Sequence, residues 1–219
     1  MLSSTNLANS STKTSRRPMD FYPTPPEVTH ALMRYLELPR LTRVLEPASG
    51  DGAMAKVIAE YCPQVCAYDI REDGFLLRQN QSQDFLTETT NTDVIITNPP
   101  FNLAEQFIRH AITKAPIVAM LLKSQYWHAK TRTPLFKEHP PAFVLPLNWR
   151  PDFRNGELGG SPTMEVAWSV WMRGVKATVY DVLEKPDTRK IESDAWCATE
   201  PSPDTWANPM FSEYESDLC

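Results

Sequence analysis

Apolar and polar residues alternate along this chain in blocks that predict successive strands and helices. Short apolar runs predict strands over residues 43–47, 65–70, 93–97 and 117–122. Apolar residues at helical spacing predict helices over residues 25–38, 53–61 and 103–114. The stretch 79–92 is polar without a clear period, so a further strand is expected to be short and to lie before Asp84.

The pattern changes after residue 122. The apolar runs 142–147 and 166–172 can pair as a long-looped hairpin, which adds an antiparallel last strand to a mostly parallel sheet. The run 117–122 is continuous, as in strands that are buried on both faces. We therefore expect an α/β fold with helices on both faces of the sheet.

A proline-rich tetrapeptide, Asn98-Pro99-Pro100-Phe101, directly follows the strand predicted over 93–97. An exocyclic amine on adenine is a poor nucleophile because its lone pair is delocalised into the ring. Two fixed acceptors, the Asn98 side-chain oxygen and the Pro99 carbonyl, can each take one N–H bond and favour a pyramidal nitrogen as the new bond forms. Two prolines stiffen the turn, and Phe101 offers a face on which a base can stack. The motif indicates methyl transfer to a planar nitrogen.

A glycine-containing turn lies about fifty residues earlier, in the stretch Val44 to Gly52. A strand, a turn of small residues and a helical pattern form a βα unit whose missing Cβ atoms let a ligand approach the backbone. The glycine spacing is too short for the dinucleotide fingerprint, and the lysine and hydroxyl residue of a phosphate-binding loop are lacking. The turn therefore indicates a nucleotide-type cofactor without a diphosphate.

Taken in order, these motifs resemble those of the S-adenosylmethionine-dependent N6-adenine DNA methyltransferases often carried by phages and prophages, over roughly residues 18 to 173. Asp20 to Pro25 resembles the N-terminal cofactor motif, and Glu46 to Gly52 resembles the glycine motif. The resemblance implies a class I methyltransferase fold, Rossmann-like, with a mostly parallel seven-stranded sheet and an antiparallel last strand. It also implies S-adenosylmethionine as cofactor.

The resemblance assigns roles to individual residues. Asp69 would accept hydrogen bonds from the cofactor ribose, and Asp84 and Phe85 would bind the cofactor adenine by hydrogen bonding and by packing. The residues expected to be catalytic are Asn98, Pro99, Pro100 and Phe101. Those expected to bind the cofactor are Tyr22, Thr24, Pro25, Glu46, Ala48, Gly50, Gly52, Asp69, Ile70, Asp84, Phe85 and Asn98.

The region 123–163 is expected to face the substrate. Between Lys123 and Arg154 there are six basic residues and two acidic ones, and such an excess favours a phosphate backbone. Aromatic residues interleaved with arginines suit an unstacked base, which an enzyme must flip out of a duplex. The residues expected to contact the substrate are Phe101, Lys123, Tyr126, Trp127, Trp149, Arg150, Phe153 and Arg154. The competing interpretation is an ordinary loop whose aromatic side chains pack on the core.

Composition divides the 219 residues into three parts: a flexible segment 1–17, a methyltransferase domain 18–183 and an acidic, Pro/Ser-rich tail 184–219. The net charge of −5 comes from the tail, which holds nine acidic and three basic residues. The four cysteines lack the spacing of a metal site, and we expect no metal. No apolar run reaches the roughly 20 residues that span a membrane, and 1–17 lacks an apolar signal core. We expect a cytoplasmic protein of a bacterial or phage-infected cell.

Only about 45 residues separate the two main motifs, so a short or loose target site is expected, read by residues after Phe101. The sequence leaves the oligomeric state open. It also leaves three alternatives to methylation of DNA adenine. The first is methylation of adenine N6 in RNA, and the second is methylation of glutamine in proteins, whose amide nitrogen is also planar. The third is a non-catalytic module that binds nucleic acid.

Overall fold

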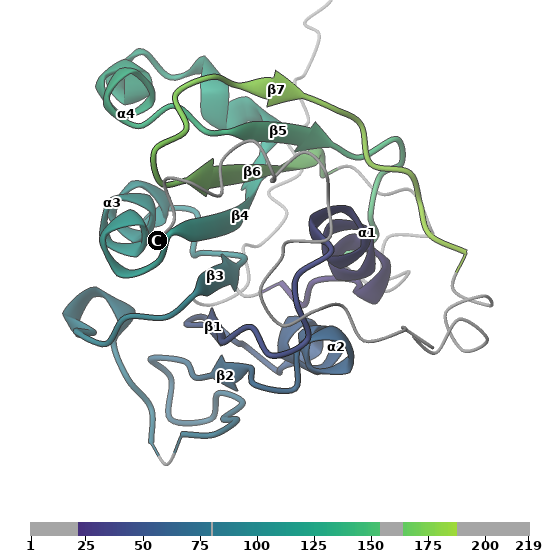
Figure 1. The fold of residues 1–219 in the computed structure, drawn as a ribbon, viewed down its shortest axis with the longest axis vertical. Helices are drawn as coiled ribbons and strands as arrows, with labels where there is room; N and C mark the ends of the chain where they lie inside the picture. The colour runs from purple at the N-terminus through teal and green to yellow at the C-terminus, as the bar shows by residue number, and fades with distance from the viewer. Residues whose placement is uncertain (1–21, 80, 154–163, 188–219) are drawn as a thin grey trace, which may run out of the picture.

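One seven-stranded sheet organises the computed structural model of this chain, which describes residues 22–79, 81–153 and 164–187. The strands lie in the order β2-β1-β3-β4-β6-β5-β7, and Figure 1 shows them stacked from β2 at the bottom to β7 at the top. Their bounds are β1 Val44–Glu46, β2 Cys66–Ala67, β3 Val94–Thr97, β4 Ile117–Lys123, β5 Phe143–Pro146, β6 Val166–Met172 and β7 Val179–Tyr180. The helices are α1 Pro26–Leu36, α2 Ala53–Tyr61, α3 Ala104–Lys114 and α4 Thr133–Glu138, with short 3-10 turns η2 Phe85–Thr87, η3 Ser124–His128 and η4 Lys130–Arg132.

The α/β class and the mostly parallel sheet are confirmed. Strands β2, β1, β3 and β4 are parallel, and β6 pairs antiparallel with both β4 and β5. The predicted hairpin of β5 and β6 forms with Phe143 opposite Val170. The antiparallel strand is not the last in the chain, because the two-residue strand β7 follows it and pairs parallel with β5.

Two strands differ from the sequence-based expectation. Among the described residues between 71 and 84 no strand forms, and Leu77 instead makes an isolated antiparallel bridge to Ala67. The only apolar run here, Phe75 to Leu77, is three residues long and is flanked by polar residues, which is too short for a strand buried on both faces. Strand β7 was not expected, since both of its residues are exposed and leave no pattern of burial in the sequence.

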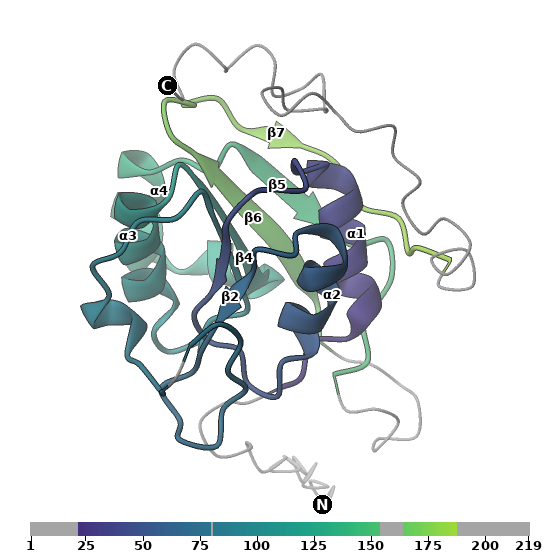
Figure 2. The same cartoon turned by 60° about the horizontal axis from the view of Figure 1, so that its bottom comes forward.

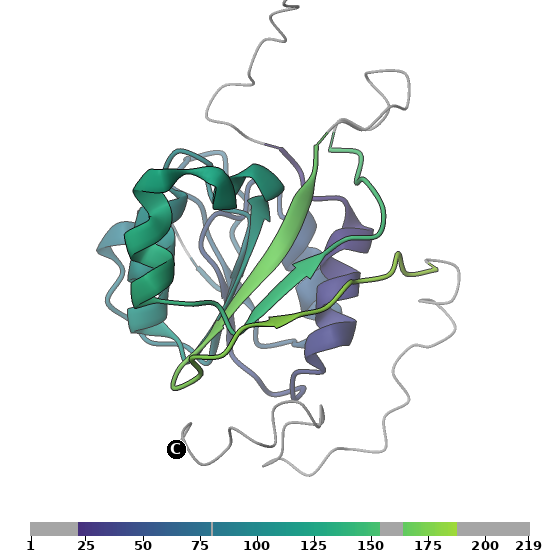
Figure 3. The ribbon, with the colours of Figure 1, turned by 90° about the horizontal axis from the view of Figure 1, so that it is seen from above.

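Helices cover both faces of the sheet, as expected. Figures 1 and 3 show α1 and α2 on one side and α3 and α4 on the other. A hydrophobic core lies on each face of the sheet. Strand β4 contributes side chains to both cores, because its successive side chains point to opposite faces. Ile117, Ala119 and Leu121 pack with α1 and α2, whereas Val118, Met120 and Leu122 pack with α3. No helix among the described residues is both long and apolar enough to cross a membrane.

The carboxyl ends of β1, β2 and β3 lie at one edge of the sheet. Figure 2 brings the β2 end of the strand order forward. The chain passes from β1 to β2 on one side and then to β3 on the other side of β1. Open α/β sheets bind their ligands at such a reversal of strand order. The glycine turn follows β1 there, and Asn98 follows β3.

Helix α1 is tied to the sheet by Trp168 of β6. The indole is fully buried, and its Nε1 donates a hydrogen bond of 3.1 Å to the carbonyl oxygen of Val28. This contact joins residues 140 positions apart in the sequence. It fixes α1, and with it the segment 22–25 that precedes the helix.

We therefore predict that Trp168→Ala lowers the free energy of unfolding by about 3–5 kcal/mol, through the cavity it leaves. Trp168→Phe keeps most of the packing and loses the hydrogen bond, which contributes about 1 kcal/mol. Urea unfolding followed by circular dichroism measures both. Tyr180→Ala, at a side chain that is 68% exposed, is the control and should change stability by less than about 0.5 kcal/mol. Equal midpoints for Trp168→Ala and Tyr180→Ala would contradict the assigned role of Trp168.

Candidate functional site

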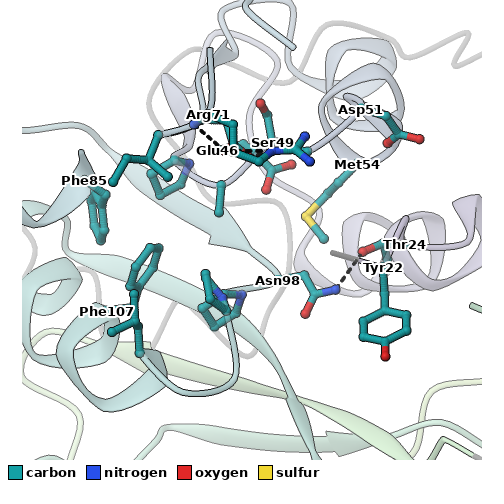
Figure 4. A pocket seen from close by; sticks show the side chains of 18 of the residues that line it. Tyr22, Thr24, Glu46, Ser49, Asp51, Met54, Arg71, Phe85, Asn98 and Phe107 are labelled. Atoms are coloured by element: carbon teal, nitrogen blue, oxygen red, sulfur yellow. Dashed lines mark hydrogen bonds and ion pairs between the residues drawn. The ribbon is translucent and has the colours of Figure 1, made fainter. Parts of the chain in front are cut away.

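A pocket of about 520 Å³ opens at this edge of the sheet. Its walls come from the segment before α1, the turn after β1, the loop after β2, η2 and the start of α3. Figure 4 shows the side chains that line it. Of the residues predicted from the sequence, the pocket lining includes Tyr22, Thr24, Glu46, Ala48, Gly50, Asp69, Ile70, Asp84, Phe85, Asn98, Pro99 and Pro100.

Hydrogen bonds join the turn after β1 to the loop after β2. Ser49 Oγ donates to the carbonyl of Phe75 at 2.6 Å, and the Phe75 amide donates to the carbonyl of Gly50 at 2.9 Å. Gly50 and Gly52 have φ values of 57° and 82°, in the left-handed region that favours glycine. The backbone of the turn is thereby held against the pocket.

Asp69 orders the same region through its carboxylate. One oxygen accepts a hydrogen bond of 2.8 Å from the Gly50 amide, and the other accepts one of 3.0 Å from the Arg71 amide. The Arg71 guanidinium adds an ion pair, with 3.3 Å between Nε and Asp69 Oδ1. An ionised carboxylate offers about four acceptor positions, so the oxygens of Asp69 retain capacity for a ligand.

Glu46 is a buried carboxyl in the pocket wall and is 1% exposed. Its Oε1 accepts a hydrogen bond of 3.2 Å from the Thr97 hydroxyl, and its Oε2 has no partner among the described residues. Burial raises the pKa of Glu46 well above its usual range, the Thr97 hydrogen bond opposes the rise, and the charges of Asp69 and Asp51 add to it. Its burial therefore disfavours the charged form of this carboxyl.

Asn98 is oriented by Thr24. Its Nδ2 donates to Thr24 Oγ1 at 3.2 Å, a contact drawn in Figure 4. The carbonyl oxygen of the same amide, Oδ1, then points away from Thr24. The next turn closes when the Leu103 amide donates to the Pro100 carbonyl at 2.9 Å, which leads into α3.

Aromatic rings form the opposite end of the pocket. The rings of Phe85 and Phe107 lie 5.0 Å apart at an interplanar angle of 48°, and both line the pocket. Ile70 also lines it although its side chain is 58% exposed. The pocket therefore joins an apolar end, suited to a flat ring, to a polar end at Glu46 and Asn98.

Three of the residues predicted to be catalytic or to bind the cofactor do not line the pocket. Pro25 is buried and directly precedes α1. Gly52 begins α2, and the Phe75 ring lies where its Cβ would be. Phe101 lies outside the lining, 6.3 Å from the ring of Tyr22 between centroids.

Sequence reasoning missed several lining residues: Ser49, Asp51, Met54, Arg71, Asn102, Leu103 and Phe107. Most of them are neighbours of predicted residues in the turns that follow β1, β2 and β3. Phe107 lies on α3. It could have been predicted, because the helix expected directly after the tetrapeptide must begin at the edge of the sheet where the parallel strands end. Among the described residues, no group of three or more His, Cys, Asp or Glu side chains is arranged to hold a metal ion.

Lys123, the last residue of β4, contacts Phe101 of the tetrapeptide, and Trp127 lies on the turn η3 that follows. Lys123 Nζ is 3.8 Å from the ring centroid of Phe101, in a cation–π contact. Trp127 is half-buried and stacks on Phe136 at 4.2 Å between centroids. Tyr126 differs from the expected surface position, because it is buried beneath the Arg132 guanidinium, 3.9 Å from its ring centroid.

Some of the remaining residues of the predicted substrate region pack on the core, as the alternative interpretation of an ordinary loop expected. Phe153 is buried in the core, and Trp149 packs against that core. The Phe153 ring is therefore not presented to a base, whereas Trp149 is half-buried. Arg150 is exposed and forms an ion pair of 2.7 Å with Glu165. Arg154 lies outside the described residues, as do the predicted segment 1–17, residues 18–21 and most of the acidic tail.

The comparisons with known proteins agree on the fold. No protein-family model matches the chain, and no curated protein sequence does. A proposed class I S-adenosylmethionine-dependent methyltransferase of Listeria monocytogenes superposes with a TM-score of 0.55 at 14% identity, over 78% of this chain and 68% of that one. A modification subunit of a proposed type I restriction enzyme from Vibrio vulnificus gives 0.57 at 14% identity, over 78% and 48%. A proposed RNA methyltransferase from Pyrococcus horikoshii gives 0.56 at 13% identity, over 72% and 89%.

The chain spans about half the length of the Vibrio subunit. At these identities the likeness concerns the fold, and the fold of this chain is that of the class I methyltransferases.

The packing of Phe75 on Gly52 leads to a stability prediction. Gly52→Ala places a Cβ against the Phe75 ring at a φ that costs about 1–2 kcal/mol for a residue other than glycine. We expect the total loss of stability to exceed that value, since the ring must also move. In a Phe75→Ala background only the φ cost should remain, and urea unfolding of the four proteins gives the coupling energy. Equal costs in both backgrounds would exclude the contact as its source.

Proposed function

We propose that this chain transfers a methyl group from S-adenosylmethionine to the N6 amine of adenine in DNA. The observation that carries the proposal is that Asn98, Pro99 and Pro100 line the same pocket as the glycine turn and Asp69. A reacting amine held by the tetrapeptide would therefore lie beside whatever the glycine turn binds.

The residues present fit the cofactor. Asp69 retains acceptor positions for ribose hydroxyls, and Phe85, Phe107 and the exposed Ile70 suit an adenine ring. Glu46, with its unpartnered Oε2, suits a cationic group at the polar end. When bound, the cofactor supplies a methyl group on a sulfonium, which is the electrophile of the reaction.

Asn98 has the role of a hydrogen-bond acceptor in the transfer. Because its Nδ2 is engaged by Thr24, its Oδ1 remains to accept one N–H of the target amine. The Pro99 carbonyl would accept the second. These acceptors stabilise the amine most strongly as it becomes pyramidal and gains positive charge, so they lower the barrier more than they strengthen binding. The product proton leaves to water, and no described residue is needed as a base.

Phe101 and Lys123 would handle the target base at the outer side of the tetrapeptide. Stacking of a base on an aromatic ring contributes roughly 1–3 kcal/mol, which helps offset the cost of flipping it from a duplex. Lys123, whose Nζ lies over the Phe101 ring, would contact a phosphate that flanks this base. Trp127, Arg150 and Arg154 remain candidates for further contacts, whereas the burial of Tyr126 and Phe153 favours structural roles for them.

RNA adenine is the second candidate substrate. The solved structures of similar fold include a modification subunit of a proposed restriction enzyme as well as a proposed RNA methyltransferase. The tetrapeptide chemistry is the same for both nucleic acids. A short or loose target site remains part of the proposal.

The mechanism is tested by variants of Asn98 and Thr24. Asn98→Ala should bind S-adenosylmethionine normally in calorimetry but lose on the order of 100- to 1000-fold in methyl transfer. Thr24→Val removes the hydrogen bond that orients the amide while keeping the side-chain shape, and should lower kcat roughly threefold to tenfold. Thr24→Ser keeps the hydroxyl and should retain the wild-type kcat. Turnover of Asn98→Ala close to wild type would refute the mechanism.

The substrate is tested by incubating the protein with labelled cofactor and duplex DNA, single-stranded DNA, RNA or protein. We expect N6-methyladenine in DNA after digestion to nucleosides and mass spectrometry. Binding to DNA should weaken steeply with salt. Arg150→Ala with Arg154→Ala should flatten that dependence and leave cofactor affinity unchanged. Label found only in cytosine, RNA or glutamine would each overturn the DNA adenine assignment.

A further inference from the structure

The short turn η2 presents two residues to the pocket, Asp84 directly before it and Phe85 within it. A three-residue 3-10 turn has poor hydrogen-bond geometry of its own, so contacts from outside must hold it in place. The proposed function uses Asp84 and Phe85 but gives no role to two polar residues that contact the turn or its ends, Glu88 and His110. Neither of these two residues is part of the pocket lining.

Glu88 directly follows η2, and its buried carboxylate joins the chain on both sides of the turn. One oxygen accepts hydrogen bonds from the backbone amides of Thr89 and Thr90, at 2.8 and 2.7 Å. The other oxygen accepts one from the side-chain amide of Gln83, the residue before Asp84. Burial raises the pKa of Glu88, but the hydrogen bonds from these three residues lower it overall. The ionised carboxylate therefore brackets the turn.

His110 anchors the same turn to helix α3. Its Nε2 lies 3.0 Å from the carbonyl oxygen of Glu88, and because a carbonyl can only accept, Nε2 carries the hydrogen and donates. The imidazole also meets the ring of Phe85 edge-on, with 4.8 Å between centroids and an interplanar angle of 88°. Phe107 lies three residues earlier on the same side of the helix, and its ring faces that of Phe85 in Figure 4. His110 thus holds both the backbone after the turn and the ring that the turn presents.

The turn also has a fixed position relative to Asp69. The Gln83 amide donates to the carbonyl oxygen of Asp69 at 3.0 Å, and the Leu86 amide donates to Oδ1 of Asp84 at 2.9 Å. The first hydrogen bond joins the turn to the loop after β2, and the second orients the Asp84 carboxyl. A shift of the turn would therefore move Asp84 and Phe85, at the adenine end of the proposed cofactor site, relative to Asp69 at its ribose end.

We propose that Glu88 and His110 are positioning residues, which hold Asp84 and Phe85 where the cofactor adenine binds and so set the affinity and the base selectivity of the site. The inference rests on the proposed function, because it takes S-adenosylmethionine as the ligand. A base with a carbonyl in place of the adenine amine cannot donate a hydrogen bond to the Asp84 carboxylate and leaves that acceptor unpartnered. Such discrimination requires a fixed carboxylate, so it is lost when the turn is released.

Two substitutions separate the hydrogen bond of His110 from its ring. His110→Phe keeps an aromatic ring against Phe85 and loses the donor, whereas His110→Gln keeps an N–H group in place of Nε2. Calorimetry gives the affinities for S-adenosylmethionine, 5′-methylthioadenosine and 5′-methylthioinosine, whose base carries the carbonyl. The wild-type protein should prefer 5′-methylthioadenosine to 5′-methylthioinosine by at least about tenfold. We expect His110→Phe to weaken binding of the two adenine ligands by about fivefold to tenfold and to reduce this preference by a similar factor. His110→Gln should recover most of both.

Glu88→Ala releases both sides of the turn, so it should act in the same direction and by more than about tenfold. Methyl transfer at saturating cofactor should keep the wild-type kcat in His110→Phe, whereas KM for the cofactor should rise with its dissociation constant. His128→Phe, at an exposed histidine outside the pocket lining, is the control and should leave all three affinities unchanged. Circular dichroism checks that each variant is folded.

Three results would overturn the inference and leave the proposed function standing. The first is an unchanged affinity in His110→Phe. The second is a preference between the two nucleosides that is absent in the wild-type protein, or that is intact in His110→Phe while both affinities fall together, since that marks a purely structural role. The third is a fall in kcat without a change in KM, which would place His110 in the transfer step. Failure of the wild-type protein to bind either S-adenosylmethionine or 5′-methylthioadenosine would instead reject the cofactor, and with it the proposed function.

Discussion

The pocket depends on the carboxylate of Asp69, which joins two loops by accepting backbone hydrogen bonds from both. Gly50 after β1 and Arg71 after β2 each donate one amide to it, and Ser49 and Phe75 reinforce the same junction. A carboxylate that accepts several backbone N–H groups is held in a single orientation. The direction in which Asp69 presents its remaining acceptor positions is therefore set before any ligand binds, and the glycine turn is held in the left-handed conformation that leaves its backbone accessible.

This junction can form only because the strands behind it are fixed. Strands β1, β3 and β4 carry apolar side chains on both faces, so each is enclosed by helices and has one register that buries them all. The polar residues begin where the strands end: Glu46 closes β1, and Asn98 follows β3 directly. The change from apolar to polar sequence thus marks the edge at which the chemistry is gathered.

The change from apolar to polar sequence also explains which elements of the structure could be predicted from the sequence. Helix α2 has the predicted bounds, and the buried strands lie within a few residues of theirs, because an apolar run flanked by small polar residues has few other solutions. The sequence did not reveal β7, whose two residues are exposed, or the bridge of Leu77 that takes the place of a strand, because neither depends on an apolar pattern. Trp149 and Phe153 were ambiguous for a similar reason, since an aromatic residue beside arginines is compatible with a base or with the core. Only the packing distinguished them. Phe107 and Phe75 reach the site through tertiary contacts that no local pattern encodes.

The hydrogen bond from Trp168 to Val28 has a consequence for the order in which the protein is made. A ribosome releases the segment of Thr24 and Pro25 early, but β6, on which α1 rests, emerges about 140 residues later. The glycine turn, Asp69 and Asn98 are all synthesised in between. Until β6 inserts between β4 and β5, α1 lacks its buried anchor and Thr24 has no fixed position from which to orient Asn98. The segment of Thr24 is thus synthesised before the rest of the site but secured after it, and a chain that stops short of β6 would carry every motif of the site without the means to hold the motifs together.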